Sequence, residues 1–192
     1  MQSAAQNDPF PDLMVRYQGG DQSAFDEIYR LTSAGLDRYL GRWAHAAERD
    51  DLVQETYLQV HRARRTYRPE LPFRPWLYAI ARHVALWSRR TRRRRWSREI
   101  GVEEYPEQTT AAPQPDALLR RRLEEAIARL PAGQREIVWL AQVEGMSSAE
   151  ISRVTGATQG AIKVRLHRAN SKLRSWLETL APGGDLKEKG ID

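Results

Sequence analysis

Residues 147–176 read SSAEISRVTGATQGAIKVRLHRANSKLRSW, and the C-terminal part of the chain takes its predicted fold from them. Ser147 and Glu150 have the spacing of a capping box, in which hydroxyl and carboxylate satisfy free amides at a helix start. Gly156 predicts the end of this short helix, and Thr158 is a candidate cap for a second, longer one. Two helices joined by a tight turn with glycine are typical of a helix-turn-helix.

The second helix of this motif has one apolar face and one basic face. Its apolar stripe consists of Ile162, Leu166, Ala169, Leu173 and Trp176. The side chains that project away from the stripe are Gln159, Lys163, Arg165, His167, Arg168 and Lys172, and no acid occurs between Thr158 and Trp176. A major groove about 12 Å wide accepts such a helix, with cations on phosphates and longer polar side chains near base edges. The pattern therefore predicts binding to duplex DNA.

Further elements precede the motif. We expect one helix from a cap at Asp116 to a stop at Pro131, and another from about Gly133 to Glu144. Residues 99–119 contain five acids, three prolines and no basic residue, and they have no apolar period. This composition indicates a linker. It is either a solvated tether or an acidic segment that imitates nucleic acid in a basic channel or against the chain's own arginines.

A second basic region lies in the N-terminal half. Residues 61–98 contain thirteen arginines and a single acid, Glu70. The aromatic residues interleaved with them are Tyr67, Phe73, Trp76, Tyr78, Trp87 and Trp96. Mutual repulsion among so many cations opposes a compact fold unless a polyanion or an acidic segment neutralises them. Arginine combined with aromatic rings suits a phosphate backbone and unstacked bases, so this region also predicts nucleic-acid binding.

Start and stop signals predict four helices in this half. We expect them to begin at Pro11 or Asp12, after the caps Asp21 and Asp50, and at about Arg74, with the second ending near Ala44 and the fourth near Arg90. In the third helix the predicted buried face is Leu52, Val53, Thr56, Val60 and Ala63, and the opposite face is Asp51, Glu55, Leu58 and Arg62. A leucine among charges on an outer face indicates a partner.

The fourth helix also divides into two arcs at about 100° per residue. The predicted core arc is Trp76, Leu77, Ile80, Ala81, Val84 and Trp87. The predicted outer arc is Tyr78, Arg82, His83, Leu86, Arg89 and Arg90, a candidate DNA surface. The fold class that follows for the whole chain is all-α, with two small helical domains joined by a flexible acidic linker.

Composition narrows the functional classes. The chain has 192 residues, a formal charge of +6 and no cysteine, which excludes disulfides and thiolate chemistry within it. Its apolar runs are too short for a membrane span, and its N-terminus lacks a signal-peptide pattern, so we expect a soluble, cytoplasmic protein. The four histidines have no metal-ligand spacing, and no Walker-type loop or GxSxG motif occurs. We therefore expect no enzyme, no metal and no cofactor.

Two long segments resemble a known family. DDLVQETYLQVHRARRTYRPELPFRPWLYAIARHVALWSRR at residues 50–90 resembles region two of the extracytoplasmic-function group of sigma-70 factors, the initiation subunits of bacterial RNA polymerase. LPAGQREIVWLAQVEGMSSAEISRVTGATQGAIKVRLHRANSKLR at residues 130–174 resembles region four. The resemblance implies a region-two domain at 1–98, a linker at 99–115, a region-four domain at 116–180 and a tail at 181–192.

The resemblance also implies roles for individual residues. Those matching the segment that binds the polymerase clamp are Asp51, Gln54, Glu55 and Leu58. Those matching the surface for the melted minus-ten element are Tyr67, Phe73, Arg82, His83, Leu86, Trp87, Arg89 and Arg90. Those matching the reader of the minus-thirty-five duplex are Gln159, Lys163, Arg165, His167, Arg168 and Lys172.

The implied function is promoter-specific initiation together with core RNA polymerase, without a small-molecule substrate. The group also implies regulation by an anti-sigma factor, often membrane-bound, which holds the sigma factor at the inner membrane face. The alternative is a helix-turn-helix regulator that does not assemble with polymerase. That alternative accounts for residues 147–176 but leaves the arginine and aromatic region of 61–98 without a purpose.

Overall fold

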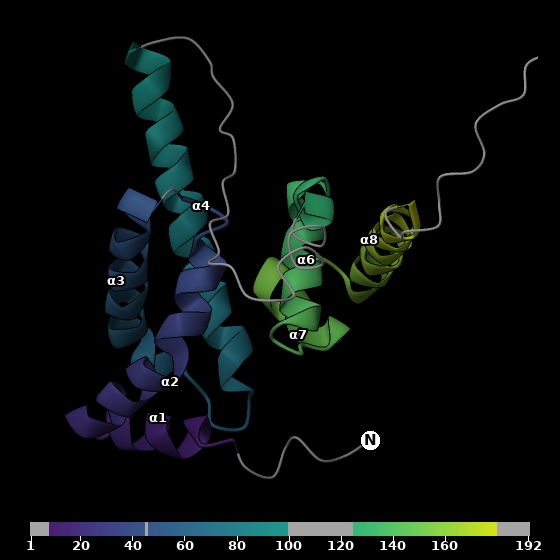
Figure 1. Cartoon of the computed structure of the whole chain (residues 1–192). Coiled ribbons are helices and arrows are strands. Elements are labelled where there is room, and N and C mark those ends of the chain that lie inside the picture. Colours follow the sequence, from purple (N-terminus) through teal and green to yellow (C-terminus); the bar gives the residue numbers. More distant parts are fainter. Residues whose placement is uncertain (1–7, 45, 100–124, 180–192) are drawn as a thin grey trace, which may run out of the picture. The chain divides into compact units, whose positions relative to one another are not determined.

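The computed structural model describes residues 8–44, 46–99 and 125–179, and all regular structure in these ranges is helical. The chain divides into two compact units, each visible in Figure 1. The first is built from α1 (Phe10–Gln18), α2 (Gln22–Leu40), α3 (Ala46–Ala63), the 3₁₀ turn η1 (Arg64–Thr66) and α4 (Phe73–Glu99). The second contains a helical end at 125–128, then α6 (Ala132–Gln142), α7 (Ser148–Thr155) and α8 (Gln159–Thr179). The all-α prediction is confirmed.

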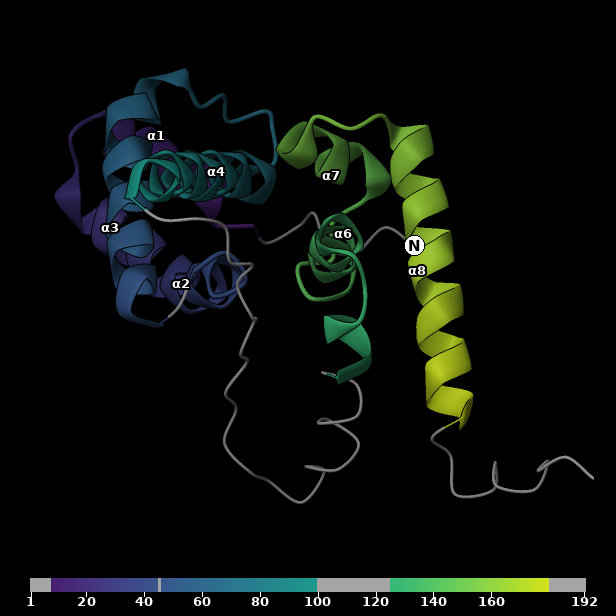
Figure 2. The same cartoon turned by 90° about the horizontal axis from the view of Figure 1, so that it is seen from above.

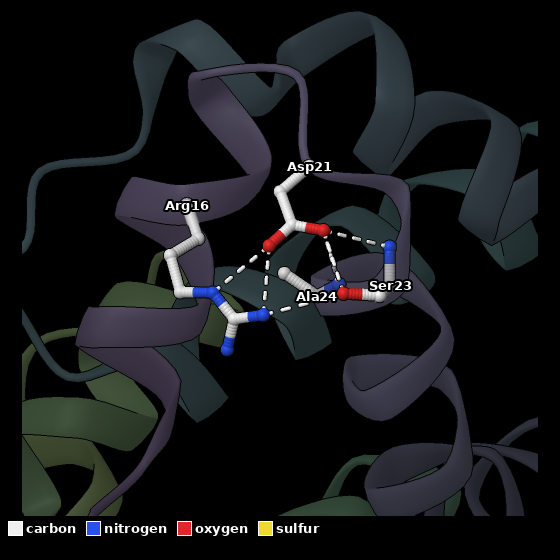
Figure 3. A network of polar contacts seen from close by, with 4 residues as sticks. All are labelled: Arg16, Asp21, Ser23 and Ala24. Carbon is white, nitrogen blue, oxygen red and sulfur yellow. Dashed lines mark hydrogen bonds and ion pairs between the residues drawn. The ribbon is translucent and has the colours of Figure 1, made fainter.

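Asp21 caps α2, as the sequence predicted, and it also fixes the corner between α1 and α2. Its Oδ1 accepts hydrogen bonds from the amides of Ser23 and Ala24, at 2.9 and 3.4 Å. Its Oδ2 accepts two from the Arg16 guanidinium, at 2.9 and 2.7 Å (Figure 3). The hydrogen bonds from Ser23 and Arg16 lower the pKa of Asp21 to about 2. Gly20 supplies the left-handed backbone of the turn, with φ of 98°.

One hydrophobic cluster of the first unit forms where α1 lies across the ends of the longer helices (Figures 1 and 2). Its buried members are Phe10, Leu13, Met14, Tyr17, Ala24, Ile28, Val60, Tyr67, Phe73 and Leu77. The rings of Phe10 and Phe73 stack with centroids 4.6 Å apart, which joins the first residues of α1 and α4. Aromatic packing of this kind adds to the hydrophobic gain of burial.

The third helix begins earlier than its predicted cap. Asp50 lies inside α3, which starts at Ala46, and α2 ends at Leu40 rather than near Ala44. Two tertiary ion pairs hold the early turns of α3: Arg49 Nε lies 2.8 Å from Asp37 Oδ1, and Glu48 pairs with Arg92 of α4. The predicted buried face of α3 is confirmed for Leu52, Val53, Thr56 and Val60, whereas Ala63 is only partly buried. Thr56 is fully buried, and its hydroxyl donates to the Leu52 carbonyl.

The fourth helix is longer than predicted. It continues through the arginine run to Glu99 instead of ending near Arg90, and its last turns extend past α2 and α3 (Figure 1). Arginine is a good helix former, and the run contains no glycine or proline. The ion pair of Arg92 with Glu48 neutralises one of the clustered cations.

The buried arc of α4 is rotated from its predicted position. Tyr78, expected outside, is 3% exposed, and its ring meets that of Tyr39 edge-on at 5.1 Å. Trp87, expected in the core arc, is 61% exposed. The buried arc is centred on Ala81 and includes Ala85, because α4 packs against both α3 and α2. The core-arc prediction was therefore wrong for Trp87 and for Tyr78.

The second unit has the helix ends that its sequence predicted. Ser147 and Glu150 form the reciprocal capping box at the start of α7. Gly156 ends that helix in the left-handed conformation, with φ of 73°. Thr158 then caps α8 by accepting from the Ala161 amide at 3.2 Å. One buried cluster of the unit consists of Ala126, Leu130, Val138, Ala169 and Leu173. The helix-turn-helix is thus confirmed, whereas Asp116 and most of the linker lie outside the described residues.

Candidate nucleic-acid interface

The α8 surface of the second unit presents the polar side chains singled out in the sequence. Ile162 and Ala169 are fully buried, and Leu166 and Trp176 pack partly buried against the same unit. All six predicted DNA contacts are exposed: Gln159, Lys163, Arg165, His167, Arg168 and Lys172. The periodicity thus assigned the two faces of α8 correctly. Their contact with DNA stays a prediction.

The turn before α8 is held by more than glycine. The Ser152 hydroxyl of α7 donates to the Ala157 carbonyl at 2.7 Å, and the Gly156 amide donates to the Ser152 carbonyl at 2.9 Å. These bonds fix where α8 begins relative to α7. No sequence pattern indicated the role of Ser152, since its partner is a backbone carbonyl.

A second candidate surface runs along α4. His83, Arg89 and Arg90 are exposed, and Arg82 and Leu86 are partly buried beside them. Trp87 is the most exposed of the large apolar side chains in the described residues. The α4 surface, defined as these six residues, therefore combines cations with a flat aromatic ring open to solvent. Such a combination suits phosphates and an unstacked base.

Two of the residues predicted to contact DNA, Tyr67 and Phe73, lie at the loop of residues 67–72 and are buried. Tyr67 and Phe73 are 4% and 0% exposed, so their rings belong to the core instead of the surface. Burial, with Asp8 and Glu70 adding to it, raises the pKa of Tyr67 to about 12. Its protonated hydroxyl donates to the Leu71 carbonyl at 2.9 Å and closes the loop. In this conformation the two rings support the loop and cannot themselves stack on a base.

Contacts from α1 form a brace that holds this loop in place, and no sequence pattern predicted it. The Gln18 amide nitrogen donates to the carbonyls of Arg64 and Tyr67, at 2.7 and 3.0 Å. The Tyr17 hydroxyl and His61 Nδ1 are 2.7 Å apart, and the Arg64 guanidinium lies 5.9 Å from the centroid of the Tyr17 ring. These partners are about 45 residues apart in sequence, so no local pattern could have indicated them.

The outer face of α3 is a third candidate surface and is more acidic. Asp51 and Gln54 are exposed, and Leu58 is 42% exposed. Glu55 is partly buried and accepts a hydrogen bond from the Gln59 amide at 2.6 Å. The α3 surface, defined as Asp51, Gln54, Glu55 and Leu58, offers carboxylates around an apolar side chain. This chemistry suits a protein partner with a basic rim and an apolar pocket.

Within residues 8–44, 46–99 and 125–179, no group of three or more His, Cys, Asp and Glu side chains could hold a metal ion. None of the helices in this described part of the chain has both the length and the apolar composition of a membrane span.

Comparison with known proteins gives two family matches in order along the chain. Residues 16–95 match the family described as Sigma-70 region 2, which takes in the α3 and α4 surfaces. Residues 120–173 match Sigma-70 region 4, which takes in α7 and most of α8.

Full-length relatives agree with both matches. The chain is 36% identical over 169 residues to the RNA polymerase sigma factor CarQ of Myxococcus xanthus, covering 87% of this chain and 97% of CarQ. It is 37% identical over 161 residues to the ECF RNA polymerase sigma factor SigF of Caulobacter vibrioides, covering 82% and 87% of the two chains.

Solved structures resemble the fold as well. One is the sigma factor RpoE in complex with the anti-sigma factor NepR from Bartonella quintana, with a TM-score of 0.69 and 25% identity over 80% of this chain and 96% of that one. Another is CnrH in complex with the cytosolic domain of CnrY, with a TM-score of 0.64 over 90% of this chain and 99% of that one. At 24% identity the second likeness concerns the fold alone.

Proposed function

Because the chain belongs to the sigma-70 family and to its extracytoplasmic-function group, we propose that it directs RNA polymerase to promoters through separate tasks for its two helical units. The first unit binds core polymerase and the opened minus-ten strand. The second reads the minus-thirty-five duplex. The alternative of a regulator that works without polymerase is not favoured, because residues 16–95 match sigma-70 region 2.

The main support for the proposal is that the polar face of α8 is exposed. All six polar side chains that the sequence assigned to duplex DNA are exposed, on a helix whose other face is anchored in its unit. Their cations contact phosphates and set the position of the helix, while groups near the groove floor read base edges. Gln159 and Lys163 lie in the first two turns of α8, the part of a recognition helix that approaches the bases.

The first unit supplies the other two tasks. The α3 surface binds the polymerase clamp, with Leu58 in an apolar pocket and the carboxylates on its rim. The α4 surface holds the separated strand, with Arg89 and Arg90 on phosphates. An unstacked base that meets the ring of Trp87 regains roughly 1–3 kcal/mol. The brace of Gln18 and Tyr17 keeps the adjoining loop in place.

The remaining parts of the proposal concern regulation and chemistry. An anti-sigma factor covers the polymerase-binding face until a signal releases it. This part is supported by the structural resemblance to the sigma factor RpoE, which was solved in complex with the anti-sigma factor NepR. The chain works in the cytoplasm, where an anti-sigma factor anchored in the membrane also holds it. It contributes no catalytic step, cofactor or small-molecule site, because RNA synthesis belongs to the polymerase.

Two paired variants test the division of tasks. Arg165→Glu with Arg168→Glu reverses charge on α8, and Asp51→Lys with Glu55→Lys reverses charge on α3. Core polymerase is mixed with each variant. Assembly is measured by size-exclusion chromatography, and promoter use by run-off transcription.

We expect the α8 pair to assemble normally but to lose transcription from promoters that need the upstream element. The α3 pair should fail to assemble at ordinary concentrations while keeping its helical content by circular dichroism. If both pairs damaged assembly and promoter use to the same degree, the two units would not have separate tasks and the proposal would be wrong.

A further inference from the structure

Val164 is an apolar side chain at the centre of the outer face of α8. It is 50% exposed, whereas Ile162 two residues earlier is fully buried. At about 100° per residue, the direction opposite the buried stripe is occupied by a short uncharged strip. Its members are Gly160, Val164, His167 and Ser171, all exposed.

Cations flank this uncharged strip on both sides. By the same helical spacing, one flank carries Arg165, Arg168 and Lys172, and the other carries Lys163 and Arg174, all of them exposed. A helix in the major groove has a phosphate backbone on each side and base edges in front of its centre. The two flanks therefore match the two backbones, and the strip matches the base edges.

Nothing within the folded unit accounts for valine at this position. A β-branched residue is a poorer helix former than the alanine or arginine that an exposed site accepts, and half of its surface gains nothing from burial. Gly160 lies one turn earlier on the same strip, and packing within the unit does not require glycine there either, because an added Cβ would meet no atom within 4 Å. Small and apolar groups at the centre of the strip allow close approach to another surface.

We propose that Val164 reads the 5-methyl group of a thymine in the upstream promoter duplex, with Gly160 admitting the base edge beside it. Among the four bases, only thymine presents a methyl group in the major groove, and apolar side chains are its natural contact. Val164 lies in the first two turns of the second helix of the motif, the part that approaches base edges. The inference rests on the proposed function of α8, and it adds which chemical group one position of the element must carry.

The test uses core RNA polymerase reconstituted with the full chain. A promoter library with a randomised upstream element is bound, and the retained DNA is sequenced. We expect one thymine in the enriched element whose preference disappears in Val164→Ala. That element is then synthesised with deoxyuridine in place of the thymine, which removes only the methyl group. Wild-type binding should weaken about fourfold, the effect of withdrawing one methyl from an apolar contact, while Val164→Ala should bind both duplexes equally.

Val143→Ala is the matched control, because Val143 is 51% exposed in the same unit but follows α6 instead of lying on α8. This variant should keep the full thymine preference. Equal binding of the two duplexes by wild type, or an undiminished preference in Val164→Ala, would overturn the inference while leaving the proposed function intact. If the reconstituted polymerase enriched no upstream element, the proposed function would fail and the inference with it.

Discussion

At the scale of single residues, Asp21 ties two helices together through one carboxylate. One of its oxygens accepts hydrogen bonds from the first amides of α2, and the other accepts hydrogen bonds from Arg16 of α1 (Figure 3). A group whose pKa is lower in the folded chain than in the unfolded chain stabilises the fold above its ordinary pKa and loses that effect as the pH falls. For Asp21 this window lies between the ordinary value of 3.8 and the folded value of about 2.

Asp21→Asn should therefore lower the melting temperature at neutral pH, because it removes the charge that Arg16 and the helix amides stabilise. The difference between wild type and variant should shrink as the pH falls below about 4, where the unfolded carboxylate becomes protonated. Thermal unfolding followed by circular dichroism between pH 7 and pH 3 measures it. Asp26→Asn, an exposed change on α2, is the control. A difference that stays constant over this range would contradict the role of Asp21.

At the scale of elements, α1 acts as a support for the loop that leads into α4. Gln18 contributes to this support, since its amide nitrogen donates to the carbonyl of Arg64, the first residue of η1, and to that of Tyr67, which follows η1. Its removal leaves those carbonyls without these hydrogen bonds, at a cost of about 1–2 kcal/mol. The loss should be local, because the aromatic core of the unit is not touched.

Gln18→Ala should accordingly raise amide hydrogen exchange at residues 64–71 and leave the middle of α3 and α4 unchanged. Hydrogen exchange followed by mass spectrometry, with Gln22→Ala as the control, distinguishes a local effect from general destabilisation. Faster exchange spread evenly over the first unit, or no change at residues 64–71, would show that Gln18 does not hold the loop.

Helix ends were predictable where the capping groups lie close together in sequence. Asp21, Thr158 and the Ser147–Glu150 pair act over two or three residues, and their roles are confirmed. The start of α3 was missed because it depends on Arg92, 44 residues from Glu48. Capping residues thus predict a helix end when their partners are near in sequence, and an ion pair between distant residues can move that end.

The faces of helices were predictable where one side packs against one neighbour. The buried stripe of α8 follows its sequence period, and all six predicted polar side chains are exposed. The helix α4 packs on both α2 and α3. Its sequence period therefore located the buried face only to within part of a helical turn. The prediction consequently placed Trp87 in the core and Tyr78 on the surface, the reverse of what the structure has. Hydrophobicity alone does not decide which of two aromatic rings packs against Tyr39.

At the scale of the whole molecule, charge is divided between surfaces instead of being spread evenly. The α3 surface carries carboxylates, whereas α8 and the arginine-rich α4 carry cations, within a chain of net charge +6. In the proposed function the acidic face binds a protein and the basic faces bind nucleic acid, so that one chain holds both partners at once. Cations on the DNA side also make binding sensitive to salt, because each phosphate contact releases counterions.

Run-off transcription of a genomic DNA library by core RNA polymerase, with and without the purified chain, measures whether this chain directs initiation. The prediction is that discrete start sites occur only when the chain is present, each preceded by two short shared elements separated by a spacer. Transcripts identical in both reactions, with no start site that depends on the chain, would contradict it.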